Sequence, residues 1–232
     1  MILNTGGRTD TVQYYSEWLL NRFREGYVLS RNPLFPNLVN RIELNPDTID
    51  VVVFCSKDYS PILGRLHEIS DRFNCYYHYT ITAYGTDIEP RVPSIRQSID
   101  TLKQLAAQVG REKIAWRYNP VLLTEKYTVQ RHMDTFEYMA RELTPYVDRC
   151  IFSFVEMYKK LETNMPELRP LCEEDKLRLA EGLGGYCPAI RTVTPDMCLD
   201  RQIRAIWHPA QRLHDCRDIQ PSLGRQLQES HP

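Results

Sequence analysis

Polar side chains that could carry chemistry follow several apolar runs of this sequence, at the point where each run ends. Asp10 and Glu89 are carboxylates that could act as a general acid and a general base. The ammonium of Lys57 or the guanidinium of Arg117 could hold a phosphate or carboxylate, because guanidinium offers a planar, bidentate fork. The candidate catalytic residues are therefore Asp10, Glu89 and Lys57, and spacing alone assigns none of these roles.

The same positions carry further groups that could bind an anionic or polyhydroxyl ligand. Gly6 and Gly7 would let a ligand approach the backbone closely, although a pair of glycines is also typical of a tight turn. Each polar side chain taken singly could equally be a loop cap or a surface ion pair, so the hypothesis depends on the whole set. The predicted ligand-binding residues are Gly6, Gly7, Arg8, Ser56, Lys57, Thr80, Thr82, Tyr84, Arg117, Asn119 and Ser153.

Five short β-rich runs must position these residues. The runs are 2–4, 49–55, 75–82, 113–120 and 150–154. They alternate with segments of helical periodicity, such as Ile95, Ile99 and Leu102 after the capping-box pair Ser94 and Gln97. Each parallel return needs a crossover, so this alternation predicts βαβ units and a parallel sheet whose carboxyl ends share one edge.

The predicted fold class is α/β, a partial or closed TIM-like (β/α) barrel with parallel strands and helical crossovers. The sequence has no GxGxxG after its first strand and no GxxxxGK[ST] motif, so both nucleotide-binding fingerprints are missing. We expect one barrel-like domain over residues 1–208, with a small hairpin inserted at the rim near residues 27–42. Residues 209–232 are polar without periodicity, which predicts a disordered or aberrant tail.

Charge and composition narrow the classes of partner. The 232 residues have a formal net charge of -1, which gives no overall positive field to hold nucleic acid or an anionic membrane, although a local basic patch stays possible. The first residues lack the pattern of a signal peptide, and no apolar run approaches membrane-spanning length. We expect a cytoplasmic protein with a small-molecule ligand and no membrane partner; the oligomeric state stays open.

The 7 cysteines fall into two groups. Cys55, Cys75 and Cys150 lie in apolar strand-like runs and are expected to be buried thiols. The residues that could together bind a metal near the C-terminus are Cys172, Cys187, Cys198, His208, His214 and Cys216. Structural zinc sites use closely spaced ligand pairs, and no CxxC pair occurs here, so the sequence predicts no metal site.

Several ordered motifs carry a resemblance to a known family. They are NTGGRTD at 4–10, FCSK at 54–57, TITAYG at 80–85, EPRVP at 89–93, WRYNP at 116–120 and IFSF at 151–154. With them the chain resembles the uncharacterised bacterial proteins of the domain of unknown function 1848 family, over residues 1–160 and more weakly to about 212. Asn119 stands where that family tends to have Asp.

That family is similar in turn to radical S-adenosylmethionine enzymes of the spore photoproduct lyase kind. The resemblance implies a (β/α) barrel, S-adenosylmethionine and a [4Fe-4S] cluster, with the cysteine cluster moved to the C-terminal end. In this chain residues 213–220 contain a single cysteine and no CxxxCxxC occurs anywhere, so the chain's cysteines do not support the cluster. We interpret the sequence as a truncated, frame-shifted or degenerate relative of that family.

Three functions stay open at this point. The first is a radical S-adenosylmethionine-related barrel with a polar pocket at the carboxyl ends of its strands and no intact [4Fe-4S] site. The second is a cluster-independent hydrolase or lyase that uses Asp10 and Glu89, with Lys57 or Arg117 holding the substrate. The third is a non-catalytic module that binds a small ligand.

Overall fold

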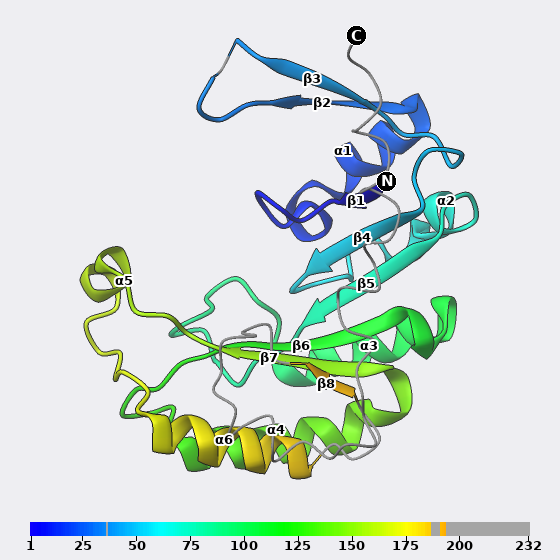
Figure 1. The fold of residues 1–232 in the computed structure, drawn as a ribbon. Helices are drawn as coiled ribbons and strands as arrows, with labels where there is room; N and C mark the ends of the chain where they lie inside the picture. Colours follow the sequence, from blue (N-terminus) through cyan, green and yellow to red (C-terminus); the bar gives the residue numbers. More distant parts are fainter. Residues whose placement is uncertain (36, 187–190, 194–232) are drawn as a thin grey trace, which may run out of the picture. The chain divides into compact units, whose positions relative to one another are not determined.

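A parallel sheet forms the centre of the computed structural model, which describes residues 1–35, 37–186 and 191–193; all of them belong to one compact unit, Met1–Met197. The described strands of this sheet are β1 (Ile2–Asn4), β4 (Val51–Ser56), β5 (Cys75–Thr80), β6 (Ile114–Val121), β7 (Arg149–Phe154) and β8 (Arg191–Val193). They lie side by side in chain order, and each neighbouring pair is parallel (Figure 1). The predicted α/β class with parallel strands is confirmed.

Helices connect successive strands, as predicted. They are α1 (Thr11–Glu25), α2 (His67–Ser70), α3 (Ile95–Val109), α4 (Val129–Leu143), α5 (Lys159–Asn164) and α6 (Glu173–Gly185). Side-chain oxygens begin the longer ones: Asp10 caps α1, Thr128 caps α4, and Ser94 forms the predicted capping box with Gln97 at α3. Gly26 ends α1 with φ 78°, a left-handed conformation that glycine adopts without a steric cost.

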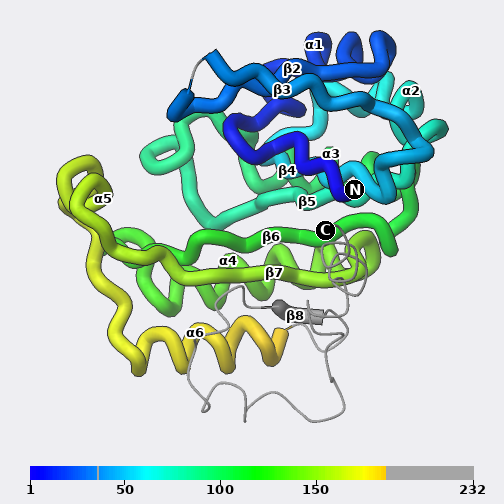
Figure 2. Tube along the Cα trace, turned by 45° about the horizontal axis from the view of Figure 1, so that its top comes forward, coloured from blue at the N-terminus to red at the C-terminus, as the bar shows by residue number. Residues whose placement is uncertain are grey.

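A separate antiparallel hairpin is inserted between α1 and β4. It consists of β2 (Tyr27–Arg31) and β3 (Val39–Glu43), with Val28 opposite Ile42 in the ladder. Both views place it beside α1, at the β1 end of the sheet (Figures 1 and 2). The predicted hairpin is therefore confirmed.

The two faces of the sheet differ in burial, because successive side chains of a strand point to opposite faces. One face is apolar: Phe54, Tyr77, Trp116 and Phe152 are fully buried, and Trp116 stacks on Phe136 of α4 with ring centroids 4.7 Å apart. The residues that alternate with these are mostly half-buried and include many polar side chains. We call this second face the polar face and define it by Cys55, His78, Thr80, Arg117, Asn119, Arg149 and Ser153.

The edges of the sheet bear on the barrel prediction. Among the described strands, β1 and β8 are the two edges and do not pair with each other, so these strands form no closed barrel. The predicted tail, residues 209–232, lies outside the described residues.

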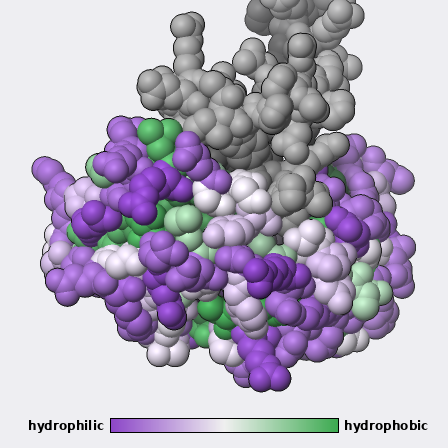
Figure 3. All heavy atoms as spheres, turned by 90° about the horizontal axis from the view of Figure 1, so that it is seen from below, coloured by the Kyte–Doolittle hydropathy of each residue, from purple (hydrophilic) through white to green (hydrophobic). Residues whose placement is uncertain are grey.

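The outer surface next to α4 and α6, which pack together, is mostly hydrophilic (Figure 3). None of the described helices combines the length and the apolar character that crossing a membrane requires.

Candidate functional site

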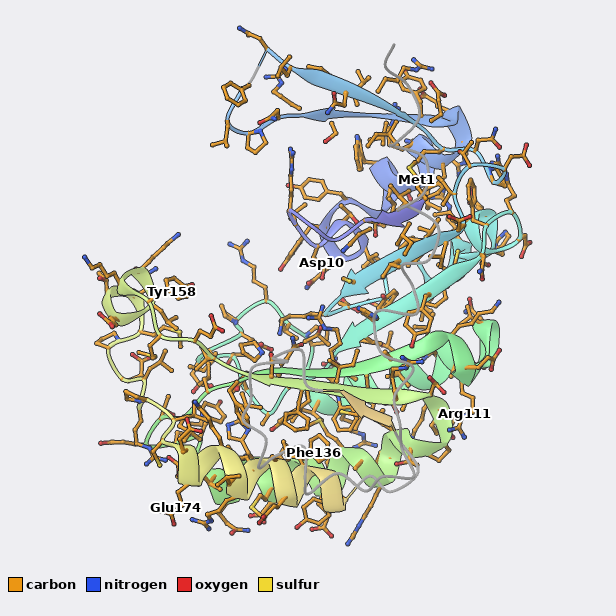
Figure 4. All side chains as sticks on the ribbon, viewed as in Figure 1. Met1, Asp10, Arg111, Phe136, Tyr158 and Glu174 are labelled. Carbon is orange, nitrogen blue, oxygen red and sulfur yellow. The ribbon has the colours of Figure 1, made fainter. Side chains whose placement is uncertain are left out.

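Asp10 joins the ends of two strands. Its Oδ1 accepts a hydrogen bond from the backbone N–H of Gln13 at 2.9 Å, which caps α1. Its Oδ2 accepts two more at 2.9 Å, from the Oγ of Ser56 and the backbone N–H of Lys57. Figure 4 shows Asp10 in the segment that leaves β1, on the side of β4. Oδ1 therefore caps α1, and Oδ2 holds the exit of β1 against the exit of β4.

Glu89 joins this arrangement through the side chain of Lys57. Lys57 Nζ lies 2.5 Å from Glu89 Oε1, and Thr82 Oγ1 donates to Glu89 Oε2 at 2.9 Å. The Glu89 side chain is only 13% exposed, so its charge is stabilised mainly by these two donors. The three predicted catalytic candidates thus lie in one cluster, which we call the exit network: Asp10, Ser56, Lys57, Thr82 and Glu89.

A second group of side chains lies across the middle of the polar face. The parallel register places Cys55 beside His78, and Thr80 beside Arg117. The Cys55 Sγ is 3.6 Å from the Nδ1 of His78. Burial raises the pKa of the Cys55 thiol. Burial, together with the positive charges of Arg117 and Arg149, lowers the pKa of His78 to about 4. Both groups are therefore neutral at neutral pH, and the pair does not provide a thiolate nucleophile.

Arg117 is half-buried and differs from the other cations of the site. Lys57 is paired with Glu89, and Arg149 with Asp148 at 2.9 Å. For Arg117, the described part of the chain provides no carboxylate within ion-pair distance. A partly desolvated guanidinium without a counter-charge attracts an anion, which it can bind through two parallel hydrogen bonds.

The other predicted residues separate into different environments. Asn119 and Ser153 are half-buried on the polar face, in the strands β6 and β7. Tyr84 is buried among aromatic and aliphatic side chains, and its hydroxyl donates to the carbonyl of Pro120 and accepts from the N–H of Leu122. This hydroxyl therefore holds the loop after β6. Arg8 does not join the exit network and instead contacts the hairpin, where its Nη1 donates to the carbonyl of Arg31 at 2.7 Å.

Gly6 packs against Cys55, and this packing is enough to explain why a glycine stands there, with no need of a bound ligand. A Cβ at Gly6 would lie 2.8 Å from the Cβ of Cys55 and 3.0 Å from its carbonyl oxygen. Gly7, the next residue, has nothing within 4 Å of such an atom. An added methyl group is therefore expected to disturb the packing at Gly6 but not at Gly7.

We expect Gly6→Ala to lower the free energy of unfolding by about 1–2 kcal/mol, since the added methyl would push the β1 exit away from β4. Gly7→Ala should change it by less than about 0.5 kcal/mol. Urea unfolding followed by circular dichroism measures both values. Equal effects of the two substitutions would contradict the close packing of Gly6 on Cys55.

Three members of the polar face were not predicted from the sequence. His78 and Arg149 were not singled out, and Cys55 was expected to be a buried thiol, whereas it is only half-buried. That expectation was wrong because Cys55 alternates with the fully buried Phe54 and so lies on the half-buried face of β4. Cys75 and Cys150 are buried, as predicted. Every second residue of a strand lies on the same face of the sheet. Applying this alternation to β5 and β7, the neighbours of the strand that carries Arg117, would have pointed to His78 and Arg149.

The described residues do not fit a [4Fe-4S] cluster. Within them, no group of three or more His, Cys, Asp or Glu side chains could hold a metal ion. Cys55, Cys75 and Cys150 belong to three different strands, and Cys172 caps α6. The remaining candidate ligands Cys187, Cys198, His208, His214 and Cys216 lie outside the described residues.

Comparison with known proteins gives one match. The family model described as Domain of unknown function (DUF1848) matches residues 2–226. This match runs through most of the segment that the sequence predicts to be an aberrant tail. No curated protein and no solved structure matches the chain.

Proposed function

We propose that this chain, which belongs to the family of the domain of unknown function DUF1848, is a partial (β/α) barrel that binds a small anionic ligand on its polar face. Arg117 is the anion-binding group, and Thr80, Asn119 and Ser153 lie around it as hydrogen-bonding partners. The observation that carries the proposal is the half-buried guanidinium of Arg117, which has no carboxylate partner among the described residues.

The strand order supports the barrel. Right-handed crossovers between strands that follow one another in chain order place every helix on the same face of the sheet. A doubly wound sheet would require a reversal of that order, and the described strands contain none. The face without helices then becomes the inside of the barrel. In barrels of this kind ligands bind at the carboxyl ends of the strands; Thr80 is the last residue of β5, and Arg117 lies beside it in the register.

The contacts favour binding over acid–base catalysis. A hydrolase or lyase would need Asp10 or Glu89 to exchange a proton with its substrate, but Asp10 accepts three hydrogen bonds and Glu89 is held by Lys57 and Thr82. The resemblance to radical S-adenosylmethionine proteins makes that molecule a candidate ligand, since its carboxylate suits a guanidinium. Because the described residues supply no cluster site, the proposal includes no iron-dependent step.

A binding panel tests this function with inorganic phosphate, citrate and S-adenosylmethionine, measured by thermal shift and isothermal titration calorimetry without added iron. We expect at least one of these anions to raise the melting temperature of the protein. Arg117→Gln should weaken the binding of that anion by at least about tenfold, because a charge-assisted hydrogen bond is lost.

The control for this variant is Arg141→Gln, which removes an exposed arginine that pairs with Glu137 on α4. It should bind the anion as tightly as the parent protein. The proposal fails if none of the three anions binds, or if the Arg117 variant keeps the parent affinity.

A further inference from the structure

A cavity of about 800 Å³ lies away from Arg117, between β1, α1 and the β2–β3 hairpin. Its walls are largely apolar. Tyr15 and Trp18 of α1 line it on one side, and Val28 and Ile42, which are opposite each other in the hairpin ladder, on the other. Trp18 is 45% exposed and Tyr15 52% exposed, so large apolar surfaces are left in contact with solvent around this hollow. Such patches are uncommon unless they bind something.

The charges around the cavity are all of one sign. Arg8, Arg22 and Arg31 line it, and none of its lining residues is Asp or Glu. Arg22 pairs with Glu25 at 2.9 Å, but its buried Nε has no hydrogen-bond partner. Arg8 uses one N–H group to hold the carbonyl of Arg31. Neither Arg8 nor Arg31 has a carboxylate partner among the described residues, so positive charge borders an apolar cavity.

We propose that this cavity binds an amphipathic anion, which is a carboxylate on a medium-length alkyl or aromatic body. The apolar body packs against Trp18 and Val28, and the carboxylate binds Arg8 at the rim, where Arg31 adds positive charge. The volume lies within the range of about 300–1,000 Å³ that is usual for small-molecule sites, and an apolar lining with a few charged groups is their usual character. Arg117 does not line the cavity, so this site is independent of the anion site on the polar face.

The test compares two probes with the same alkyl chain and opposite charge, decanoate and decyltrimethylammonium, by isothermal titration calorimetry with the full chain below the micellar concentration. We expect decanoate to bind with a stoichiometry of one. Decyltrimethylammonium should bind at least about tenfold more weakly, because its charge is repelled by the arginines.

Two variants locate the site. Arg8→Gln removes the anion-binding group, and Trp18→Glu adds a carboxylate at a wall position that is 45% exposed. Each should weaken the binding of decanoate by at least about tenfold, the loss expected for one charge-assisted interaction. Arg141→Gln and Arg117→Gln should both bind decanoate as the parent does. Equal binding of the two probes, parent-like binding by both site variants, or loss of decanoate binding in Arg117→Gln would overturn the proposal.

Discussion

Replacing Asp10 with alanine is expected to lower the free energy of unfolding by about 3 kcal/mol, because one substitution removes an N-cap and two further hydrogen bonds to a charged acceptor. The donors left without an acceptor are the N–H groups of Gln13 and Lys57, while the hydroxyl of Ser56 keeps the carbonyl of Asp58 as its acceptor. Urea unfolding, followed by circular dichroism and tryptophan fluorescence together, measures the loss.

Two other substitutions separate the contributions of Asp10. Thr128→Ala removes a cap that serves only α4, through one hydrogen bond to the N–H of Arg131, and should cost about 1 kcal/mol. Asp10→Asn keeps an acceptor for the cap and should fall between the two alanine variants. If Asp10→Ala costs no more than Thr128→Ala, the carboxylate does not hold the two strand exits together.

This prediction assigns Asp10 a role in positioning. Lys57 is held at its backbone by Asp10 and at its ammonium by Glu89, so the three residues fix the path of the chain at the exits of β1, β4 and β5. From the sequence, these three residues were predicted to be catalytic because carboxylates and a lysine after strands are typical of active sites. Their hydrogen-bond partners show that they have a structural role, and the sequence alone does not reveal those partners.

The general architecture could be predicted from local pattern. Alternation of β-rich runs with amphipathic segments predicts parallel strands, and the Ser94 and Gln97 pair predicts where α3 begins. The strand β8 (Arg191–Val193) was missed because only one of its three residues, Val193, is apolar, so it shows no apolar run. The convergence of the strand exits was also predictable, since parallel strands all end at one edge.

The pairing of side chains was not predictable in the same way. Glu89 meets Lys57 and Thr82 only because the loop after β5 folds back over the strand exits, and no periodic pattern encodes that path. The polar face was obscured by the apolar run of β4, which resembles a strand that is covered on both sides. His78 was hidden among the tyrosines of β5, although its neighbours across the register are Cys55 and Ala115.

His78 should make the stability of the fold depend on pH between about 6.5 and about 4, the ordinary pKa of the group and its value in the folded protein. In this window the unfolded chain protonates His78 while the folded protein keeps it neutral, so acid favours unfolding. The free energy of unfolding is therefore fully retained above pH 6.5 and falls by up to about 3 kcal/mol as the pH approaches 4. The cause is burial, reinforced by Arg117 and Arg149.

The contribution of His78 is isolated by comparing the parent protein with His78→Gln in urea at pH 7.5 and pH 4.5. Other titrating groups, including the buried His132, affect both proteins alike, so the difference between their pH dependences reports on His78. We expect the glutamine variant to lose clearly less stability on acidification. His67→Gln replaces an exposed histidine on α2 and should behave as the parent. Identical pH dependences of the parent and His78→Gln would show that the imidazole is not held neutral between the two arginines, and the positive character assigned to the polar face would then lose its main support.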